Sequence, residues 1–221
     1  EAAAAAANMG NRTLLITMNM NAMAAMSCNP AVGGIAKGQI VREIDALGGQ
    51  MGIVADKTMI QFRMLNKSKG PAVWSPRVQS DKFEFAAEWR SVLEKTNNLE
   101  FWQDHVDSLI VEGDIIRGVH CQMGGDIYSK TVILTNGTFL NGKIFIGEKS
   151  FSGGRISENA SYGITEQLVS LGFEADRMKT GTPMRIDGRS INFGKLSEQK
   201  GDDDVTGFSY LEIEKPKQQR S

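Results

Sequence analysis

A thiol and two adjacent glycines stand close together in the stretch "SCNPAVGGIAKGQ", which holds Cys28, Gly33 and Gly34. The Asn-Pro pair after the cysteine suits a helix start, because asparagine can cap a helix and proline fits its first turn. A cysteine there meets the positive end of the helix dipole and can become reactive, and glycines let a planar ligand or an anion approach the backbone. A substrate-positioning thiol and a buried, inert cysteine both fit, and composition alone favours the inert one.

A second candidate site lies in the stretch "TVILTNGTF", where a polar turn with Thr135 and Gly137 follows an apolar segment. Ligands of open α/β sheets bind beyond the carboxyl ends of the strands. This turn offers a hydroxyl group and a residue that permits a close backbone approach. An ordinary turn at the end of a strand has the same composition, so the signal alone leaves both interpretations open.

Basic residues gather in the stretch "NKSKGPAV", which carries Lys67 and Lys69. Such side chains in a loop can hold phosphate groups, but a solvated surface loop has the same composition. Arg155 in "SGGR" and Arg185 in "KTGTPMR" lie in similar polar stretches that glycines punctuate. None of these stretches alone specifies a ligand.

The composition limits the classes of protein that fit. The chain has 221 residues, of which 41% are hydrophobic, so it can bury a substantial core, and its net charge of −1 argues against nucleic-acid binding through overall basicity. Two cysteines and two histidines make no disulfide framework, and His120 and Cys121 should point to opposite faces of a strand, so we predict no metal site. We see no apolar run of membrane-spanning length and no signal-peptide pattern, so we expect a soluble cytoplasmic protein without a membrane partner.

Periodicity, caps and turn residues predict an α/β fold with an antiparallel β insertion. The expected helices cover residues 2–7, closed at Gly10, residues 35–47, residues 81–95, capped by Asp81, and residues 161–171, closed by Gly172. We expect strands at residues 13–17, in a series over residues 98–137 with turns at "EGD" and "GGD", and at residues 173–178. The proline-broken stretch 60–80 looks extended and loop-like, and the chain becomes polar beyond residue 179.

The first expected helix is rich in alanine, and no N-cap or earlier turn stands before it. A small helix of this kind suits close packing on a parallel sheet, in which a strand normally precedes the helix. We therefore interpret the chain as a fragment that begins after the first strand and turn of a βαβ unit. The alternative is an isolated alanine-rich helix at a natural terminus.

Five motifs occur in this order in one protein family: "SCNPAVGGIAKGQ", "IQFRMLNKSKGPAV", "TNGTFLNGKIFIG", "SGGR" and "KTGTP". On these motifs the chain resembles the MnmG family, also called GidA, over nearly its whole length. The resemblance implies the FAD-binding, Rossmann-like fold of the two-dinucleotide-binding-domain flavoproteins. It also implies a homodimeric enzyme that uses NADH and a methylene-tetrahydrofolate carbon donor. With the GTPase MnmE, such an enzyme adds an aminomethyl or carboxymethylaminomethyl group to carbon 5 of the tRNA wobble uridine.

The resemblance also implies roles for single residues. Cys28 matches a cysteine implicated in catalysis or in positioning the uridine. Contacts to FAD are implied for Gly33, Gly34, Val106, Thr135, Gly137 and Ser161. Loops that are candidates for tRNA or cofactor phosphates contain Lys67, Lys69 and Arg155.

The chain departs from the family pattern at several points. Met184 stands where a second proline usually follows "KTGTP", and Trp74 stands where many members have a basic residue. The glycine-rich turn that cradles the FAD diphosphate is not in this sequence, so we expect the chain alone to be inactive and to bind FAD weakly or not at all. We expect residues 1–185 to form a FAD-binding domain without its first strand and glycine-rich turn, and residues 186–221 to begin an inserted second domain.

Three other interpretations stay open. The first is the folate- and FAD-dependent tRNA uridine methyltransferase, a smaller relative with the same FAD domain. The second is a non-catalytic folded fragment that serves only as a core or an interaction module. A general flavin oxidoreductase acting on a small metabolite is the third, and it accounts less well for the cysteine and "KGP" motifs.

Overall fold

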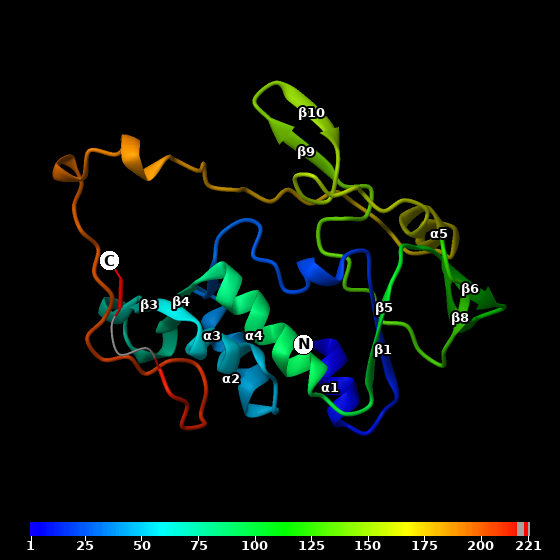
Figure 1. Cartoon of the computed structure of the whole chain (residues 1–221), viewed down its shortest axis with the longest axis horizontal. Helices are drawn as coiled ribbons and strands as arrows, with labels where there is room; N and C mark the ends of the chain where they lie inside the picture. Colours follow the sequence, from blue (N-terminus) through cyan, green and yellow to red (C-terminus); the bar gives the residue numbers. More distant parts are fainter. Residues whose placement is uncertain (216–218, 221) are drawn as a thin grey trace. The chain divides into compact units, whose positions relative to one another are not determined.

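The structure is a computed structural model that describes residues 1–215 and 219–220 (Figure 1). The helices are α1 (Ala2–Asn8), α2 (Gly38–Ala46), α3 (Met51–Lys57), α4 (Lys82–Glu94) and α5 (Ile164–Ser170). The strands are β1 (Thr13–Thr17), β2 (Ala31–Gly33), β3 (Met59–Leu65), β4 (Ser75–Ser80), β5 (Leu99–Gln103), β6 (Val106–Glu112), β7 (Ile115–Cys121), β8 (Gly125–Tyr128), β9 (Lys143–Ile146) and β10 (Lys149–Ser152). Short 3-10 turns are η1 (Met20–Ala22), η2 (Lys67–Lys69), η3 (Pro71–Val73), η4 (Gly188–Ser190) and η5 (Phe193–Lys195).

The chain divides into two compact units that do not follow chain order. Unit 1 comprises residues 1–13, 22–99 and 181–221, and unit 2 comprises residues 14–21 and 100–180. Each unit is described by itself below. The predicted boundary between residues 185 and 186 stays a prediction.

Unit 1 contains an antiparallel sheet with the strand order β2-β4-β3. Val78 on the central strand lies between Val32 and Phe62 on its neighbours, and all three side chains are buried. Such cross-strand pairs are a main source of sheet stability. The stretch 60–80, expected to be extended and loop-like, is extended at both ends as β3 and β4 and loop-like only at residues 66–74, and its pairing into a sheet was not predicted. Pro76 lies in the central strand, where its ring has no N–H to donate but its carbonyl still accepts a hydrogen bond from the N–H of Gly34 at 2.9 Å.

The outer edge of β3 is covered by the polar segment near the C-terminus. The N–H of Asp202 donates to the carbonyl of Phe62 at 2.9 Å, and the N–H of Arg220 donates to the carbonyl of Ile60 at 2.7 Å. In return, the side chains of Gln219 and Asp202 accept from the N–H groups of Phe62 and Met64 at 2.6 and 2.8 Å. The polar groups that an edge strand normally presents are thus satisfied within the chain.

A second contact fixes the same C-terminal region to the helices of unit 1. The carboxylate of Asp56 on α3 is buried and accepts from the N–H groups of Phe208, at 2.8 and 2.9 Å, and Ser209, at 2.9 Å. Burial raises the pKa of Asp56 above its ordinary value, and the backbone hydrogen bonds only partly offset this effect. The ring of Phe208 is fully buried, so a residue far along the chain completes the core of unit 1.

The helices of unit 1 follow the sequence pattern in part. Helix α1 buries Ala4 and Ala7, and Gly10 follows it with a φ of +86°, as predicted. Helix α2 begins at Gly38 rather than at residue 35, because Ala36 has a φ of +58°, which a right-handed helix does not admit. Helix α3 follows shortly after and was not predicted, since the glycine pair before it indicates a helix end.

Helix α4 is the clearest success of the sequence pattern. The carboxylate of Asp81 accepts from the N–H groups of Phe83 and Glu84 at 2.9 and 3.1 Å, as an N-cap residue does. The periodicity predicts that Phe85, Trp89 and Val92 face inward, and the structure buries the first two but leaves Val92 half-buried. The remaining buried position of this helix is Leu93.

Unit 2 contains a pair of parallel strands and an antiparallel meander. At one end of the β1-β5 pair, the N–H of Thr13 donates to the carbonyl of Asn98. At the other end, the N–H of Asp104 donates to the carbonyl of Thr17, so the two strands run in the same direction (Figure 1). Strands β6, β7 and β8 form the meander, with Gly113 among the residues of the first turn. Both turns fall where the sequence predicts them.

Helix α5 is tied to the meander through one glutamine. The side chain of Gln167 accepts from the N–H of Leu109 at 2.6 Å and donates to its carbonyl at 2.7 Å, so it pairs with β6 as a neighbouring strand would. At the start of the helix, the carboxylate of Glu166 accepts from the N–H of Gly163 at 3.1 Å. The predicted start at residue 161 is therefore a few residues early.

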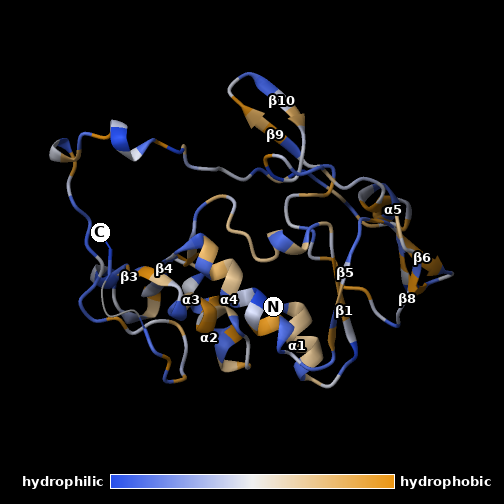
Figure 2. Ribbon diagram, viewed as in Figure 1, coloured by the Kyte–Doolittle hydropathy of each residue, from blue (hydrophilic) through white to orange (hydrophobic). Residues whose placement is uncertain are grey.

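Two predicted strands are absent from the described part of the chain. Residues 131–134 and 173–178 have no regular structure, and Ile133 and Phe173 are 64% and 62% exposed. A strand needs a partner for its backbone hydrogen bonds, and none of the described strands lies beside either segment. The β9-β10 hairpin was missed, because no alternation of apolar and polar residues marks either side of Gly147. Figure 2 shows β9 as a hydrophobic strand, and Phe145 on it is 68% exposed.

His120 and Asp126 form an exposed ion pair between β7 and β8. The Nδ1 atom of His120 lies 2.7 Å from Oδ1 of Asp126, and this hydrogen bond raises the pKa of His120 above 6.5. A raised pKa in the folded state means that the protonated pair stabilises unit 2 below about pH 6.5 and that this stabilisation is lost as the pH rises through the folded-state pKa. We expect Asp126→Asn to lower the pKa of His120, measured by NMR titration of its ring protons. The exposed turn variant Asp114→Asn should leave this pKa in place, and an unchanged pKa in Asp126→Asn would contradict the ion pair.

Opposite faces of β7 carry His120, which is exposed, and Cys121, which is buried, as predicted. Burial raises the pKa of the Cys121 thiol. In the described part of the chain, no three histidine, cysteine or acidic side chains gather as metal ligands, and no helix is long and apolar enough to cross a membrane.

Candidate functional site

Cys28 lies in a loop of unit 1 that leads into β2, not into a helix. The expected helix start after the cysteine is therefore wrong, because Pro30 precedes an extended strand and α2 begins only at Gly38. The thiol is partly exposed and free. A reactive role for Cys28 thus has to rest on its neighbours rather than on a helix dipole.

Those neighbours come from the "KTGTPMR" segment. The hydroxyl of Thr182 donates to Sγ of Cys28 at 3.4 Å. The guanidinium of Arg185 donates through Nη2 to the carbonyl of Ser27 at 3.3 Å and also to the carbonyl of Cys28. The structure therefore joins two motifs that are more than 150 residues apart in the sequence, with separations of 154 to 158 positions. Sequence reasoning noted both motifs but gave no signal that they meet.

Gly33 and Gly34 follow the thiol loop with φ angles of +77° and +99°. A side chain at Gly33 would place its Cβ 2.4 Å from the carbonyl oxygen of Pro76 and 2.6 Å from the ring of Phe208. At Gly34 the nearest atom to such a Cβ would be Cδ of Arg77, at 3.7 Å. Gly33 is therefore required for packing, whereas Gly34 has room beside its backbone.

The two basic residues predicted for phosphate binding differ in their surroundings. Lys67 forms an ion pair with Asp202 at 2.8 Å, and Lys69 makes no ion pair within the described residues. Burial acts to raise the pKa of Asp202. The hydrogen bonds from Lys67 and from the N–H of Met64, together with the charge of Arg63, outweigh it, so the pKa of Asp202 is lowered. Lys67 thus has its charge matched within unit 1, and Lys69 is the freer of the two for an external phosphate.

In unit 2, the structure brings together the turn that follows Gly137 and Ser161, which lies three positions before the first residue of α5. The N–H of Ser161 donates to the carbonyl of Phe139 at 2.8 Å, and the carbonyl of Ser161 accepts from the N–H of Asn141 at 2.8 Å. Gly137 has a φ of +56°. Ser161 is buried, whereas Thr135 and Gly137 are exposed.

Val106 is the first residue of β6 and lies near the same region. Its neighbour Asp107 lies against Gly163, where a Cβ would meet the Asp107 carbonyl oxygen at 2.4 Å. This close approach brings the start of β6 beside the start of α5. The start of β6, the start of α5 and the turn at Phe139 are thus neighbours, whereas no contact within the described residues places Thr135 beside them.

Two asparagine side chains in this region have unused acceptors. The Oδ1 atoms of Asn136 and Asn141 are buried and have no hydrogen-bond partner among the described residues. A buried acceptor without a donor is costly, and a hydroxyl or amide group of a ligand would satisfy it. These two acceptors are therefore free to accept from water or from a polar ligand. Sequence reasoning missed both residues, although Asn136 lies within the "TNG" motif.

Arg155 is held by contacts inside unit 2. Its guanidinium donates to both carboxylate oxygens of Glu158, with the Nη2–Oε1 distance at 3.0 Å, and lies 5.1 Å from the ring centre of Phe139. These contacts show a structural role for Arg155. Its predicted role in binding phosphates stays a prediction.

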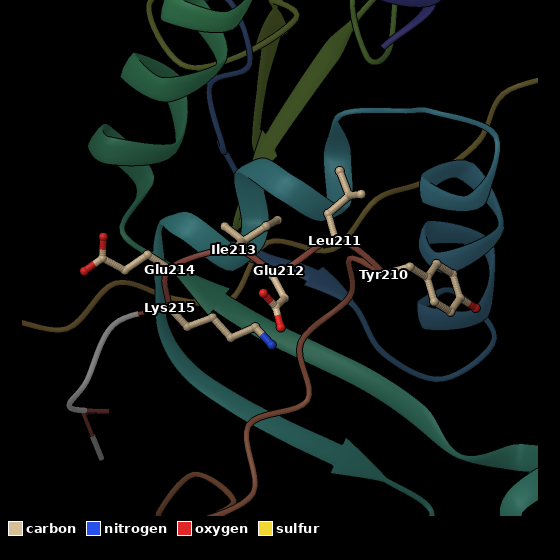
Figure 3. A pocket seen from close by; sticks show the side chains of 6 residues that line it. All are labelled: Tyr210, Leu211, Glu212, Ile213, Glu214 and Lys215. Carbon is tan, nitrogen blue, oxygen red and sulfur yellow. The ribbon is translucent and has the colours of Figure 1, made fainter.

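Figure 3 shows a hollow in unit 1 that is lined by six consecutive residues, 210–215. The ring of Tyr210 lies 4.7 Å from the guanidinium of Arg42 on α2, and Lys215 donates to the carbonyl of Thr206 at 2.7 Å. These contacts hold the loop on unit 1. None of the predicted site residues lines this hollow, so we assign it no function.

A sequence model of the family "Glucose inhibited division protein A" matches residues 1–221. The chain belongs to the GidA family. Its relatives in the family include the protein named "tRNA uridine 5-carboxymethylaminomethyl modification enzyme MnmG" of Flavobacterium johnsoniae, which is 64% identical over 222 residues and is covered for 36% of its length. The protein of the same name from Cytophaga hutchinsonii is 63% identical over 210 residues and is covered for 34%. The two alignments include 100% and 95% of this chain. The chain therefore matches nearly throughout, and it spans about a third of the length of these curated relatives.

The solved structures agree with this assignment. GidA of Aquifex aeolicus superposes with a TM-score of 0.93 at 45% identity, over 99% of this chain and 37% of the other. A GidA-related protein of Thermus thermophilus has a TM-score of 0.52 at 23% identity over 78% of this chain and 64% of the other, which shows a shared fold alone. The predicted fold class, a Rossmann-like α/β fold with antiparallel strands, is thereby confirmed.

Proposed function

We propose that the whole protein, of which this chain is a part, modifies the wobble uridine of tRNA. It adds an aminomethyl or carboxymethylaminomethyl group to carbon 5 of the base. The observation that carries this proposal is the name shared by relatives that are 59–64% identical over nearly the whole chain. The 45% identity to GidA of Aquifex aeolicus over 99% of this chain supports the same family assignment.

We propose FAD as the cofactor, with NADH and methylene-tetrahydrofolate as co-substrates. FAD would supply the redox chemistry, while the protein orients it and excludes competing reactions. The residues proposed to hold it in unit 2 are Val106, Thr135, Gly137 and Ser161, and the unused acceptors of Asn136 and Asn141 support this choice. In unit 1, Gly34 offers open backbone for a close approach, and Gly33 serves the packing of the same loop.

The proposed partners are tRNA, the GTPase MnmE and a second copy of the whole protein. Lys69 is the stronger candidate for a tRNA phosphate, since the charge of Lys67 is matched by Asp202 and that of Arg155 by Glu158. The proposed location is the cytoplasm, where tRNA is modified in bacteria. We retain the proposal that residues 1–185 belong to a FAD-binding domain and that residues 186–221 begin a second one.

The substitution Cys28→Ser in the whole protein tests this function. We expect it to keep its flavin absorbance near that of the parent while the modified uridine falls on the order of 100-fold, the scale seen when a group acting at the reacting atoms is removed. The measurement is mass spectrometry of tRNA nucleosides from a strain that lacks the natural gene and carries the variant. Ser197→Ala, an exposed change in unit 1, is the matched control. Normal uridine modification by Cys28→Ser would sink the catalytic role of this residue.

A further inference from the structure

The loop that carries Cys28 is contacted by two side chains from a segment that lies far away in the sequence. Thr182 donates its hydroxyl to Sγ at 3.4 Å, which is within the range for a hydrogen bond to sulfur. Within the described residues, Thr182 is the hydrogen-bond donor from outside the thiol loop that reaches this sulfur. Because Cys28 is partly exposed, this contact orients its sulfur and is not part of a buried core.

Arg185 acts on the backbone of the same loop. One nitrogen of its guanidinium donates to two successive carbonyl groups, those of Ser27 and Cys28. The guanidinium keeps its charge at every physiological pH, and hydrogen bonds from a charged donor are stronger than neutral ones. The chain on both sides of the peptide bond is therefore held while the side chain of Cys28 remains partly exposed.

The two contacts are complementary. Arg185 fixes where the Cα atom of Cys28 lies, and Thr182 fixes where the sulfur points from it. A thiol held at both points enters a reaction with fewer orientations to lose, which is how positioning lowers a barrier.

We propose that Thr182 and Arg185 are positioning residues for the Cys28 thiol. This inference rests on the proposed function for the claim that the thiol serves catalysis. The positioning itself is a property of the 221-residue chain and can be measured without tRNA or flavin. It gives the "KTGTPMR" motif a task that neither composition nor the resemblance assigns to these two residues.

The first experiment measures alkylation of Cys28 by iodoacetamide in the whole protein, followed by mass spectrometry of the peptides that carry Cys28 and Cys121. We expect Thr182→Val to slow the reaction of Cys28 about fivefold and Thr182→Ser to restore it to within about twofold. Thr180→Val is the matched control, because this exposed threonine makes no hydrogen bond in the described part of the chain. Cys121 is fully buried and should stay unmodified in every variant, which reports that unit 2 is folded.

The role of Arg185 is tested in the same assay by a double-mutant cycle. We expect Thr182→Val to have no further effect in an Arg185→Ala background, because the loop no longer presents its sulfur to residue 182. Equal effects of Thr182→Val with and without Arg185 would overturn the part of the proposal that concerns Arg185. A Thr182→Val rate equal to that of the parent or of Thr180→Val would overturn the part that concerns Thr182.

The second experiment measures uridine modification by the same variants of the whole protein. We expect Thr182→Val to lower kcat for uridine modification about fivefold at unchanged flavin content and KM, and Thr182→Ser to restore kcat. One outcome would separate the two claims: Thr182→Val changes the alkylation rate of Cys28, but neither Thr182→Val nor Cys28→Ser lowers kcat. That result would leave the positioning of the thiol intact and refute its catalytic use. Unchanged kcat in Thr182→Val while Cys28→Ser is inactive would overturn the proposal itself.

Discussion

Replacing Gly33 with alanine is expected to destabilise unit 1 by at least about 3 kcal/mol. The left-handed backbone at this position costs an alanine roughly 1–2 kcal/mol by itself. The new methyl group would also lie 2.4 Å from the carbonyl oxygen of Pro76 and 2.6 Å from the ring of Phe208, so a central strand would have to shift. Urea denaturation followed by tryptophan fluorescence measures the change, because Trp89 is buried in the same unit.

The neighbouring glycine provides the control for this prediction. Gly34 has a φ of +99°, but a Cβ there would have only Arg77 nearby, at 3.7 Å. Gly34→Ala should therefore cost only the conformational part, roughly 1–2 kcal/mol. If both variants lost the same stability, the contact between Gly33 and the C-terminal segment would be refuted. The pair also separates packing from ligand binding, since loss of flavin in Gly33→Ala alone would not show that this residue contacts the cofactor.

Replacing Phe208 with alanine is expected to destabilise unit 1 by about 3–5 kcal/mol, the usual range for a buried phenylalanine. The ring is fully buried, and the backbone that carries it is held by the carboxylate of Asp56. The cavity cannot collapse easily, because Gly33 and the strand behind it are fixed by the sheet. The measurement is again the free energy of unfolding in urea.

Phe193→Ala is the matched control for the same loss of volume. Phe193 is 68% exposed, so its removal should change stability by no more than about 0.5 kcal/mol. Removing the ring of Phe208 should also lessen the penalty of Gly33→Ala, because one of its two clashes disappears. Strictly additive effects in the double variant would contradict the direct contact.

Helix ends and turns were predicted correctly where they depend on neighbouring residues within one element. The cap at Asp81, the glycine after α1 and the turns of the meander were predicted, because each depends on residues a few positions apart. The pairing of the stretch 60–80 into a sheet was not predicted, for the opposite reason. Its prolines indicate a loop, and only the partner strands and the C-terminal cover show why the backbone is extended there.

The candidate site was predictable by motif but not by arrangement. Cys28 and the "KTGTP" stretch were each noted, yet nothing local predicts that Thr182 meets the thiol, since 154 positions separate them. The absent strand at residues 131–134 shows the same limit, because an apolar run becomes a strand only beside a partner. The unused acceptors of Asn136 and Asn141 are visible only once burial is known.

The nested arrangement of the two units has a consequence for synthesis on the ribosome. All residues of this chain that belong to unit 2 have left the exit tunnel once residue 180 has emerged, whereas unit 1 still lacks the ring of Phe208, whose backbone meets Asp56 across 152 positions. Contacts of such long range are made late, because the intervening chain must first be closed into a loop. Unit 2 is therefore expected to fold before unit 1. The edge of β3 stays open to wrong pairing until the residues that cover it, Asp202 and Arg220, have been synthesised.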